Sequence, residues 1–172
     1  MFARRQCLLP FCLVLLLASD IGADAATWKK YNYPADGFEV EFSGTVKVAQ
    51  TEMTAETAKK VVRSTDYMQE DGSYVYIIGA SLVKDQVNFD NGVKSSFEAL
   101  KCKTTTSDTP LNLAGGRARE LRGADCMDDN MRAEARYFTT EKWFYQVIFI
   151  IKKDGDLADA RRFLQSFKLT GK

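Results

Sequence analysis

The sequence contains no histidine among its 172 residues. This absence excludes Ser-His-Asp and Cys-His nucleophile systems, because both use an imidazole as the base. It also excludes zinc and copper sites that depend on histidine ligands. Any acid–base catalysis would have to use carboxylates, lysine, tyrosine or cysteine.

The chain also lacks an excess of one charge. Its 24 basic and 23 acidic residues give a formal net charge of +1, and the two kinds are interspersed. A nucleic-acid-binding protein needs a basic stripe to neutralise phosphates, and a polybasic membrane anchor needs a cluster of cations. We expect neither nucleic acid nor a membrane surface as the partner.

Proline and linker sequences are scarce as well. The chain has three prolines, and it shows no low-complexity tract and no internal repeat. Hydrophobic residues make up 45% and charged residues 27%, which is an ordinary globular balance. The length and composition predict one domain after the N-terminal segment.

The N-terminal segment has the pattern of a secretory signal peptide. Arg4 and Arg5 precede a continuous apolar stretch over residues 7–18. The run Ala23-Asp24-Ala25 then fits a signal-peptidase site. The pattern predicts export to the periplasm of a bacterium or secretion from the cell.

We therefore predict that residues 1–25 are cleaved and that residues 26–172 form a single mature domain. An uncleaved anchor is the main alternative, but twelve apolar residues span only about 18 Å as a helix, against about 30 Å of hydrocarbon. A lipoprotein fits less well, because bulky Phe11 precedes Cys12 where a small residue is expected. No stable membrane span is expected after cleavage.

Cleavage would leave two cysteines, Cys102 and Cys126. Two cysteines in an exported chain most simply form one disulfide. Closing a loop of about 25 residues would contribute roughly 3–4 kcal/mol in the chain-entropy model. Two free thiols or a metal pair are the alternatives, although a two-cysteine metal site would want histidine partners.

The stretch WFYQVIFII, residues 143–151, is the most apolar one beyond the N-terminal segment. Aromatic and β-branched residues favour a strand, and as a strand both of its faces are apolar. Such a strand must be covered on both sides, so we place it at the centre of a sheet. The strand around Tyr76 has the same character and is expected beside Val147.

Other segments alternate apolar and polar residues with a period of two, which predicts strands with one buried face. Turn signals such as Asp36-Gly37, Asp71-Gly72 and Gly115-Gly116 separate several of them and predict hairpins. The predicted strands lie near residues 28–33, 38–42, 58–68, 74–83, 111–113, 117–122, 131–138 and 143–151. Residues 45–54 alternate more weakly, and a short edge strand and an extended loop are the two interpretations.

Two segments instead have a helical period. Val93, Phe97 and Leu100 fall on one helix face, and Asp90 is the predicted N-cap. The tail from residue 157 is amphipathic, and Asp154 or Asp156 is its predicted cap. These helices are the expected covers, so we predict an α+β fold with a largely antiparallel sheet covered by helices on both faces.

The order of several segments resembles a known family. They are YNYPADGFEVEF near the start, AGGRARELRG in the middle, and RYFTTEKWFYQVIF and RRFLQSFKL at the end. Together they are similar to small exported bacterial proteins of the PsbP-like α/β/α-sandwich family, over nearly all of residues 28–169. The resemblance implies a non-catalytic fold that is often attached to larger assemblies or has no assigned role. It supplies no catalytic residues.

The basic run RARELR provides the only candidate contact residues. Arg117 and Arg119 share one strand face with Leu121, whereas Arg122 shares the other face with Glu120. Arginine forks suit carboxylates and phosphates, so the three arginines are candidate partner or anion contacts. The plainer interpretation is an exposed strand with cross-strand ion pairs.

The acidic run DCMDDN, residues 125–130, offers oxygen ligands at close spacing. It lacks the spacing of a calcium-binding loop, and a solvated turn beside the disulfide is the favoured interpretation. We assign no metal site, no cofactor and no catalytic residue.

These observations favour an exported binding, assembly or accessory module with an unknown protein partner or a homo-oligomer. A small-ligand carrier is an alternative that would need a cavity of a few hundred Å³ between sheet and helices. A histidine-independent enzyme based on carboxylates is a further alternative, which would need acidic residues that converge in a pocket.

Overall fold

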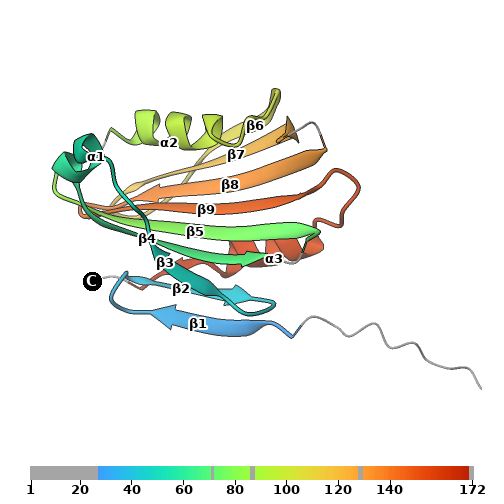
Figure 1. The fold of residues 1–172 in the computed structure, drawn as a ribbon, viewed down its shortest axis with the longest axis horizontal. Coiled ribbons are helices and arrows are strands. Elements are labelled where there is room, and N and C mark those ends of the chain that lie inside the picture. Colours follow the sequence, from blue (N-terminus) through green and yellow to red (C-terminus); the bar gives the residue numbers. More distant parts are fainter. Residues whose placement is uncertain (1–26, 71, 86–87, 128–129, 171–172) are drawn as a thin grey trace, which may run out of the picture.

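The computed structural model describes residues 27–70, 72–85, 88–127 and 130–170. They form a seven-stranded antiparallel sheet, a separate three-stranded sheet and three helices (Figure 1). The predicted signal peptide lies outside these described residues.

The large sheet has the strand order β3-β4-β5-β9-β8-β7-β6, and every neighbouring pair is antiparallel. Its strands are β3 (Lys47–Gln50), β4 (Val61–Glu70), β5 (Tyr74–Val83), β6 (Thr104–Leu111), β7 (Arg117–Cys126), β8 (Met131–Thr139) and β9 (Trp143–Lys152). The predicted central position is confirmed, because β9 is the middle strand and β5 lies beside it, with Ile78 opposite Val147.

Both faces of β9 are buried, as its two-sided apolar sequence predicts. Val147 and Phe149 belong to one hydrophobic cluster, whereas Ile148 and Ile150 belong to a second cluster on the opposite face. Successive side chains of a strand point to opposite faces, so one strand supplies both clusters. The two clusters are the two halves of the core.

The first cluster is closed by a layer that contains a second sheet. This sheet has the order β1-β2-β10 and consists of β1 (Lys29–Tyr33), β2 (Phe38–Phe42) and β10 (Lys168–Leu169). The α3 helix (Ala158–Ser166) lies next to β2 and adds Phe163 and Leu164 to the same cluster. The hydroxyl of Ser166 accepts a hydrogen bond from the backbone N–H of Glu41 at 2.9 Å. The end of α3 therefore lies beside β2 and satisfies one of its backbone donors.

The second cluster packs against α2 (Phe89–Glu98), which buries Phe89, Val93 and Phe97. These positions fall on one face of the helix, as the sequence period predicts. In Figure 1 this helix lies over the end of the sheet that contains β7 and β8. The helices therefore contribute to the core, but the fold is dominated by its sheets, and the small sheet makes up much of one layer.

Two local predictions differ from the structure. Asn88, not Asp90, caps α2, because its side chain accepts a hydrogen bond from the N–H of Asn91. The strand predicted from residue 58 begins at Val61, since the preceding residues form the short helix α1 (Ala55–Lys60). Thr54 caps the N-terminus of this helix, because its hydroxyl accepts a hydrogen bond from the backbone N–H of Thr57.

The cap of α3 also differs in detail. The residue at the N-cap position is Leu157, which makes no side-chain cap bond. The carboxylate of Asp156 instead accepts a hydrogen bond from the N–H of Ala158 at 2.9 Å. Asp156 thus satisfies one of the helix's free N–H groups from one position earlier than a standard cap.

Candidate functional site

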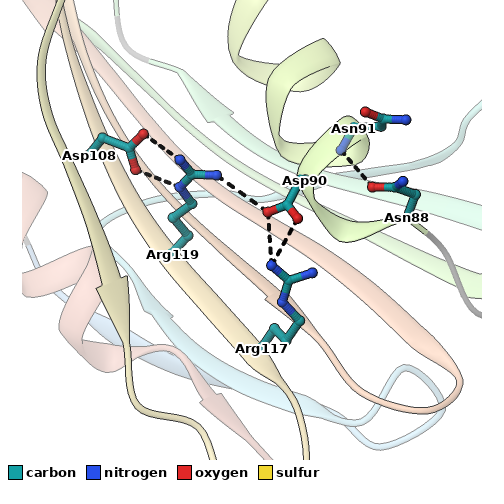
Figure 2. A network of polar contacts seen from close by, with 6 residues as sticks. All are labelled: Asn88, Asp90, Asn91, Asp108, Arg117 and Arg119. Atoms are coloured by element: carbon teal, nitrogen blue, oxygen red, sulfur yellow. Dashed lines mark hydrogen bonds and ion pairs between the residues drawn. The ribbon is translucent and has the colours of Figure 1, made fainter.

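Two of the three candidate arginines form a network with aspartates from two other elements (Figure 2). Arg117 and Arg119 on β7 both reach Asp90, at the start of α2, with N–O distances of 2.9 and 3.5 Å. Arg119 also contacts Asp108 on the neighbouring strand β6. The network ties the first turn of α2 to two strands of the sheet.

The Arg119–Asp108 contact has the geometry of a fork. Nε and one terminal nitrogen of Arg119 each donate to a different oxygen of Asp108, both at 2.5 Å. Two parallel bonds from one guanidinium are stronger and more directional than a single contact. The hydrogen bond to Asp108 raises the pKa of Arg119 above its ordinary value.

An open groove surrounds this network. Its two adjoining parts have volumes of about 570 and 510 Å³ and share Phe89, Asp90, Gly116 and Arg117 in their linings. The guanidinium of Arg117 lies 4.8 Å from the centroid of the Phe89 ring, a cation–π contact. Gly116 is required here, since a Cβ at this position would lie 2.0 Å from the carbonyl oxygen of Thr139.

Arg122 lies on the opposite face of β7. It contacts Glu120 at 2.9 Å and Glu134 at 3.7 Å, and Glu120 also accepts from Arg136 at 2.7 Å. Glu134 faces Arg122 across the β7–β8 pair, and Arg136 faces Glu120. The structure therefore does not bring the three candidate arginines together, and it places cross-strand ion pairs where the sequence pattern suggests them.

The Arg117–Arg119 network is satisfied within the chain. An incoming anion would have to displace Asp90 or Asp108, which already neutralise the two guanidiniums. The arrangement therefore acts first as a link between α2, β6 and β7. Its side chains are partly exposed, so each pair contributes only about 0.2–1 kcal/mol.

No group of acidic or cysteine side chains that could hold a metal ion occurs in the part of the chain that the structure describes. Asp128 and Asp129 of the acidic run lie outside the described residues. Asp125 is held instead by Lys153, whose Nζ lies 2.7 Å from its carboxylate. This hydrogen bond lowers the pKa of Asp125 below its ordinary value.

The two cysteines predicted to pair do lie together. Cys102 follows α2 and Cys126 ends β7, and their sulfur atoms are at bonding distance. Cys126 is fully buried. Gly123 is required beside them, because a Cβ there would lie 2.5 Å from the sulfur of Cys102.

A second groove, which the sequence analysis did not single out, runs between α3 and the small sheet. We call it the α3 groove, and it has a volume of about 460 Å³. Its charged lining residues are Lys30, Glu39, Glu41, Arg161, Arg162 and Lys168. Four cations thus face two carboxylates in one concave surface.

Two of these cations are already paired inside the groove. Lys30 contacts Glu39 at 2.7 Å, and Arg162 contacts Glu41 at 2.9 Å. Among the residues that the structure describes, Arg161 and Lys168 have no ion-pair partner. The α3 groove therefore differs from the α2 network, whose arginines are all neutralised.

The sequence contained a signal for this groove. Arg161 and Arg162 are adjacent on the polar face of an amphipathic helix, opposite the buried Phe163 and Leu164. A pair of arginines on a helix face is ordinary, so the signal was weak. The other cations come from β1 and β10, and only the tertiary fold brings them to α3.

The arrangement of the sheets and helices defines a class. The chain has a PsbP-like fold: one large antiparallel sheet, with a small sheet and helices packed on it. A solved structure that shows this likeness is the solution structure of cyanobacterial PsbP (CyanoP) from Synechocystis sp. PCC 6803. The match has a TM-score of 0.53 and 14% sequence identity, and it covers 89% of this chain and 98% of that chain. The resemblance stated from the sequence is thereby confirmed for the fold.

No protein-family model and no curated protein matches the chain by sequence. Within the described residues, no helix is long and apolar enough to cross a bilayer.

Proposed function

We propose that this chain is an exported, non-catalytic accessory or assembly module that binds a protein partner. It is an α/β/α sandwich cross-linked by a Cys102–Cys126 disulfide. It acts in the periplasm or outside the cell. The PsbP-like fold supports the general role, and the secretory pattern and the adjacent cysteines support the location.

The non-catalytic role is inferred from the ion pairing of the buried carboxylates. Asp36, Glu120 and Glu134 are the buried acidic residues among those described. Each lies within ion-pair distance of an arginine. Asp36 contacts Arg63, and both glutamates contact Arg122. General acid–base catalysis needs a carboxylate whose proton affinity is tuned in a pocket that substrate can enter. These three carboxylates instead stabilise the fold.

The two grooves support binding of a macromolecule better than transport of a small ligand. Both are open, and charged side chains line them. A small-molecule carrier needs a mostly apolar cavity that encloses its ligand. A partner protein can instead cover a polar groove and contact several of its charges at once.

The test is chemical cross-linking of intact producing cells, followed by size-exclusion chromatography of the envelope extract. We expect the protein to elute in a complex much larger than a single chain, whose mass before cleavage is 19.3 kDa. Elution as a monomer both with and without cross-linker would overturn the proposal. The released protein should begin at Ala26, and recovery with residues 1–25 attached would overturn the export step.

A further inference from the structure

We propose that the α3 groove binds an acidic segment of the protein partner. This inference rests on the proposed function and names the chemistry of the partner. The groove carries an excess of two positive charges, since four cations face two carboxylates. The excess resides on Arg161 and Lys168, the two cations without an ion-pair partner among the described residues.

The paired residues fix the geometry of the groove. Nε and one terminal nitrogen of Arg162 both donate to the same oxygen of Glu41 at 2.9 Å. Its guanidinium also lies 4.7 Å from the centroid of the Trp28 ring. Arg162 is therefore held from two sides, and the neighbouring Arg161 is left to project from the exposed face of α3.

The walls of the groove are held together by the backbone. Ser166, near the end of α3, accepts a hydrogen bond from the N–H of Glu41 on β2. Lys168 lies on β10 directly opposite Glu39 on β2. The α3 wall and the sheet wall therefore cannot separate without breaking the edge of β2. A partner meets a preformed surface, which lowers the cost of ordering on binding.

The strength of exposed ion pairs decides which kind of anion fits. Each exposed pair contributes about 0.2–1 kcal/mol, so one small carboxylate or phosphate gains too little to bind well. A segment with several acidic side chains can meet Arg161 and Lys168 together. Its carboxylates can also replace Glu39 and Glu41 as the ion-pair partners of Lys30 and Arg162. An acidic peptide segment is therefore the ligand class that the groove suits.

The test uses the full mature chain and a fluorescently labelled oligoglutamate peptide, with an oligoglutamine peptide of equal length for comparison. Binding is followed by fluorescence anisotropy at low and at physiological salt. The variant pair Arg161→Gln and Lys168→Gln removes the two unpaired cations. The matched control pair Lys60→Gln and Lys142→Gln removes two exposed cations outside the groove.

We expect the oligoglutamate peptide to bind and the oligoglutamine peptide not to bind. The groove variant should weaken binding by about fivefold, and the control should change it by less than about twofold. Equal loss in both variants would show a general charge effect and overturn the inference. Equal binding of the two peptides would also overturn it. The melting temperature of each variant checks that a loss does not come from unfolding.

The outcome is separable from that of the proposed function. If the cross-linked complex forms with both wild type and the groove variant, the accessory role stands and the groove assignment fails. If no complex forms with wild type, the proposed function itself fails. If the complex is lost only in the groove variant, both are supported.

Discussion

The phenol of Tyr67 donates a hydrogen bond to the carboxylate of Asp36, which also contacts the guanidinium of Arg63. Asp36 lies in the turn between β1 and β2, whereas Tyr67 lies on β4 of the large sheet. The backbone oxygen of Asp36 accepts a further hydrogen bond from the phenol of Tyr145 at 2.9 Å. One turn residue thus anchors the small sheet to two strands of the large sheet.

Replacement of this carboxylate should therefore destabilise the whole fold. We expect Asp36→Asn to lower the free energy of unfolding by about 2–3 kcal/mol, because it leaves the Arg63 guanidinium without its charge partner. The matched control is Asp85→Asn at an exposed position, which should change it by less than about 0.5 kcal/mol. Urea unfolding followed by circular dichroism measures both. Equal values for the two variants would refute the anchoring role.

Docking of α3 can be tested through Phe163. Its ring is fully buried and lies 4.7 Å from the ring of Tyr76 and 5.3 Å from that of Phe42, between centroids. We expect Phe163→Ala to cost about 3–5 kcal/mol and Phe163→Asp to prevent folding, since an unpaired charge would be buried. The exposed Gln165→Asp on the same helix should retain a normal thermal transition. A normal transition in Phe163→Asp would show that α3 is not docked.

The proposed disulfide makes a prediction about mass and stability. The exported protein should weigh two hydrogens less than its reduced form, and its thiols should not react with an alkylating agent. The double variant Cys102→Ala with Cys126→Ala should be less stable by about 3–4 kcal/mol. Treatment with a dithiol reductant should lower the melting temperature of wild type and leave the double variant unchanged. Rapid alkylation of the native protein would contradict the pairing.

The α2 network should contribute a small, salt-sensitive energy. In a double-mutant cycle of Asp90→Ala and Arg117→Ala, we expect a coupling energy of about 0.5 kcal/mol, because both side chains are more than half exposed. The coupling should fall when the salt concentration is raised. A coupling energy that is unchanged by salt would contradict an electrostatic link. A melting curve recorded for each variant supplies the measurement.

Alkaline pH should destabilise the protein through its buried tyrosines. Burial raises the pKa of Tyr137 from 10.0 to about 12, and burial likewise raises the pKa of Tyr67 and Tyr145. The folded state therefore holds these protons more tightly than the unfolded state. The resulting stability is fully present below pH 10 and is lost as the pH rises toward 12.

The check is urea unfolding at a series of alkaline pH values, with tyrosinate absorbance as a second probe. For Tyr137 alone we expect a loss of about 2 kcal/mol between the two pKa values. Tyr137→Phe should reduce the slope of stability against pH over this window. An unchanged slope would show that another group causes the alkaline loss.

Much of the fold could be predicted from short-range pattern. The alternation in β2 and the Asp36-Gly37 turn correctly predicted a hairpin, and β1 pairs with β2 in that register. The two-sided apolar sequence of β9 correctly placed it in the centre of the sheet. These signals work because burial on one face or two faces leaves a direct mark on residue choice.

Long-range arrangement was less predictable. Sequence pattern did not reveal that β1 and β2 form a separate sheet with β10, since a strand with one buried face looks the same in either sheet. The α2 cap was misassigned because Asn88 and Asp90 are both good capping residues. Asp90 is instead drawn to Arg117, which lies 27 positions away in the sequence. Such competition between partners is settled only in three dimensions.

The candidate contact residues show the same limit. Period-two alternation correctly separated Arg122 from Arg117 and Arg119, but it could not identify the aspartates that neutralise them. It also could not place Lys168 in the same groove as Arg161, because the first lies on β10 and the second on α3. Charge balance depends on neighbours that are distant in sequence.

The bond from the Glu41 N–H to the Ser166 hydroxyl has a consequence for how copies of this protein behave when concentrated. A strand with a bare flank can recruit the same strand from another copy, and repeated recruitment leads to fibrils. At β2 the helix occupies that flank. On β6, the outermost strand at one end of the large sheet, Pro110 has no N–H to offer a newcomer. These two features leave fewer free backbone donors along the two borders for the strand of another copy to pair with.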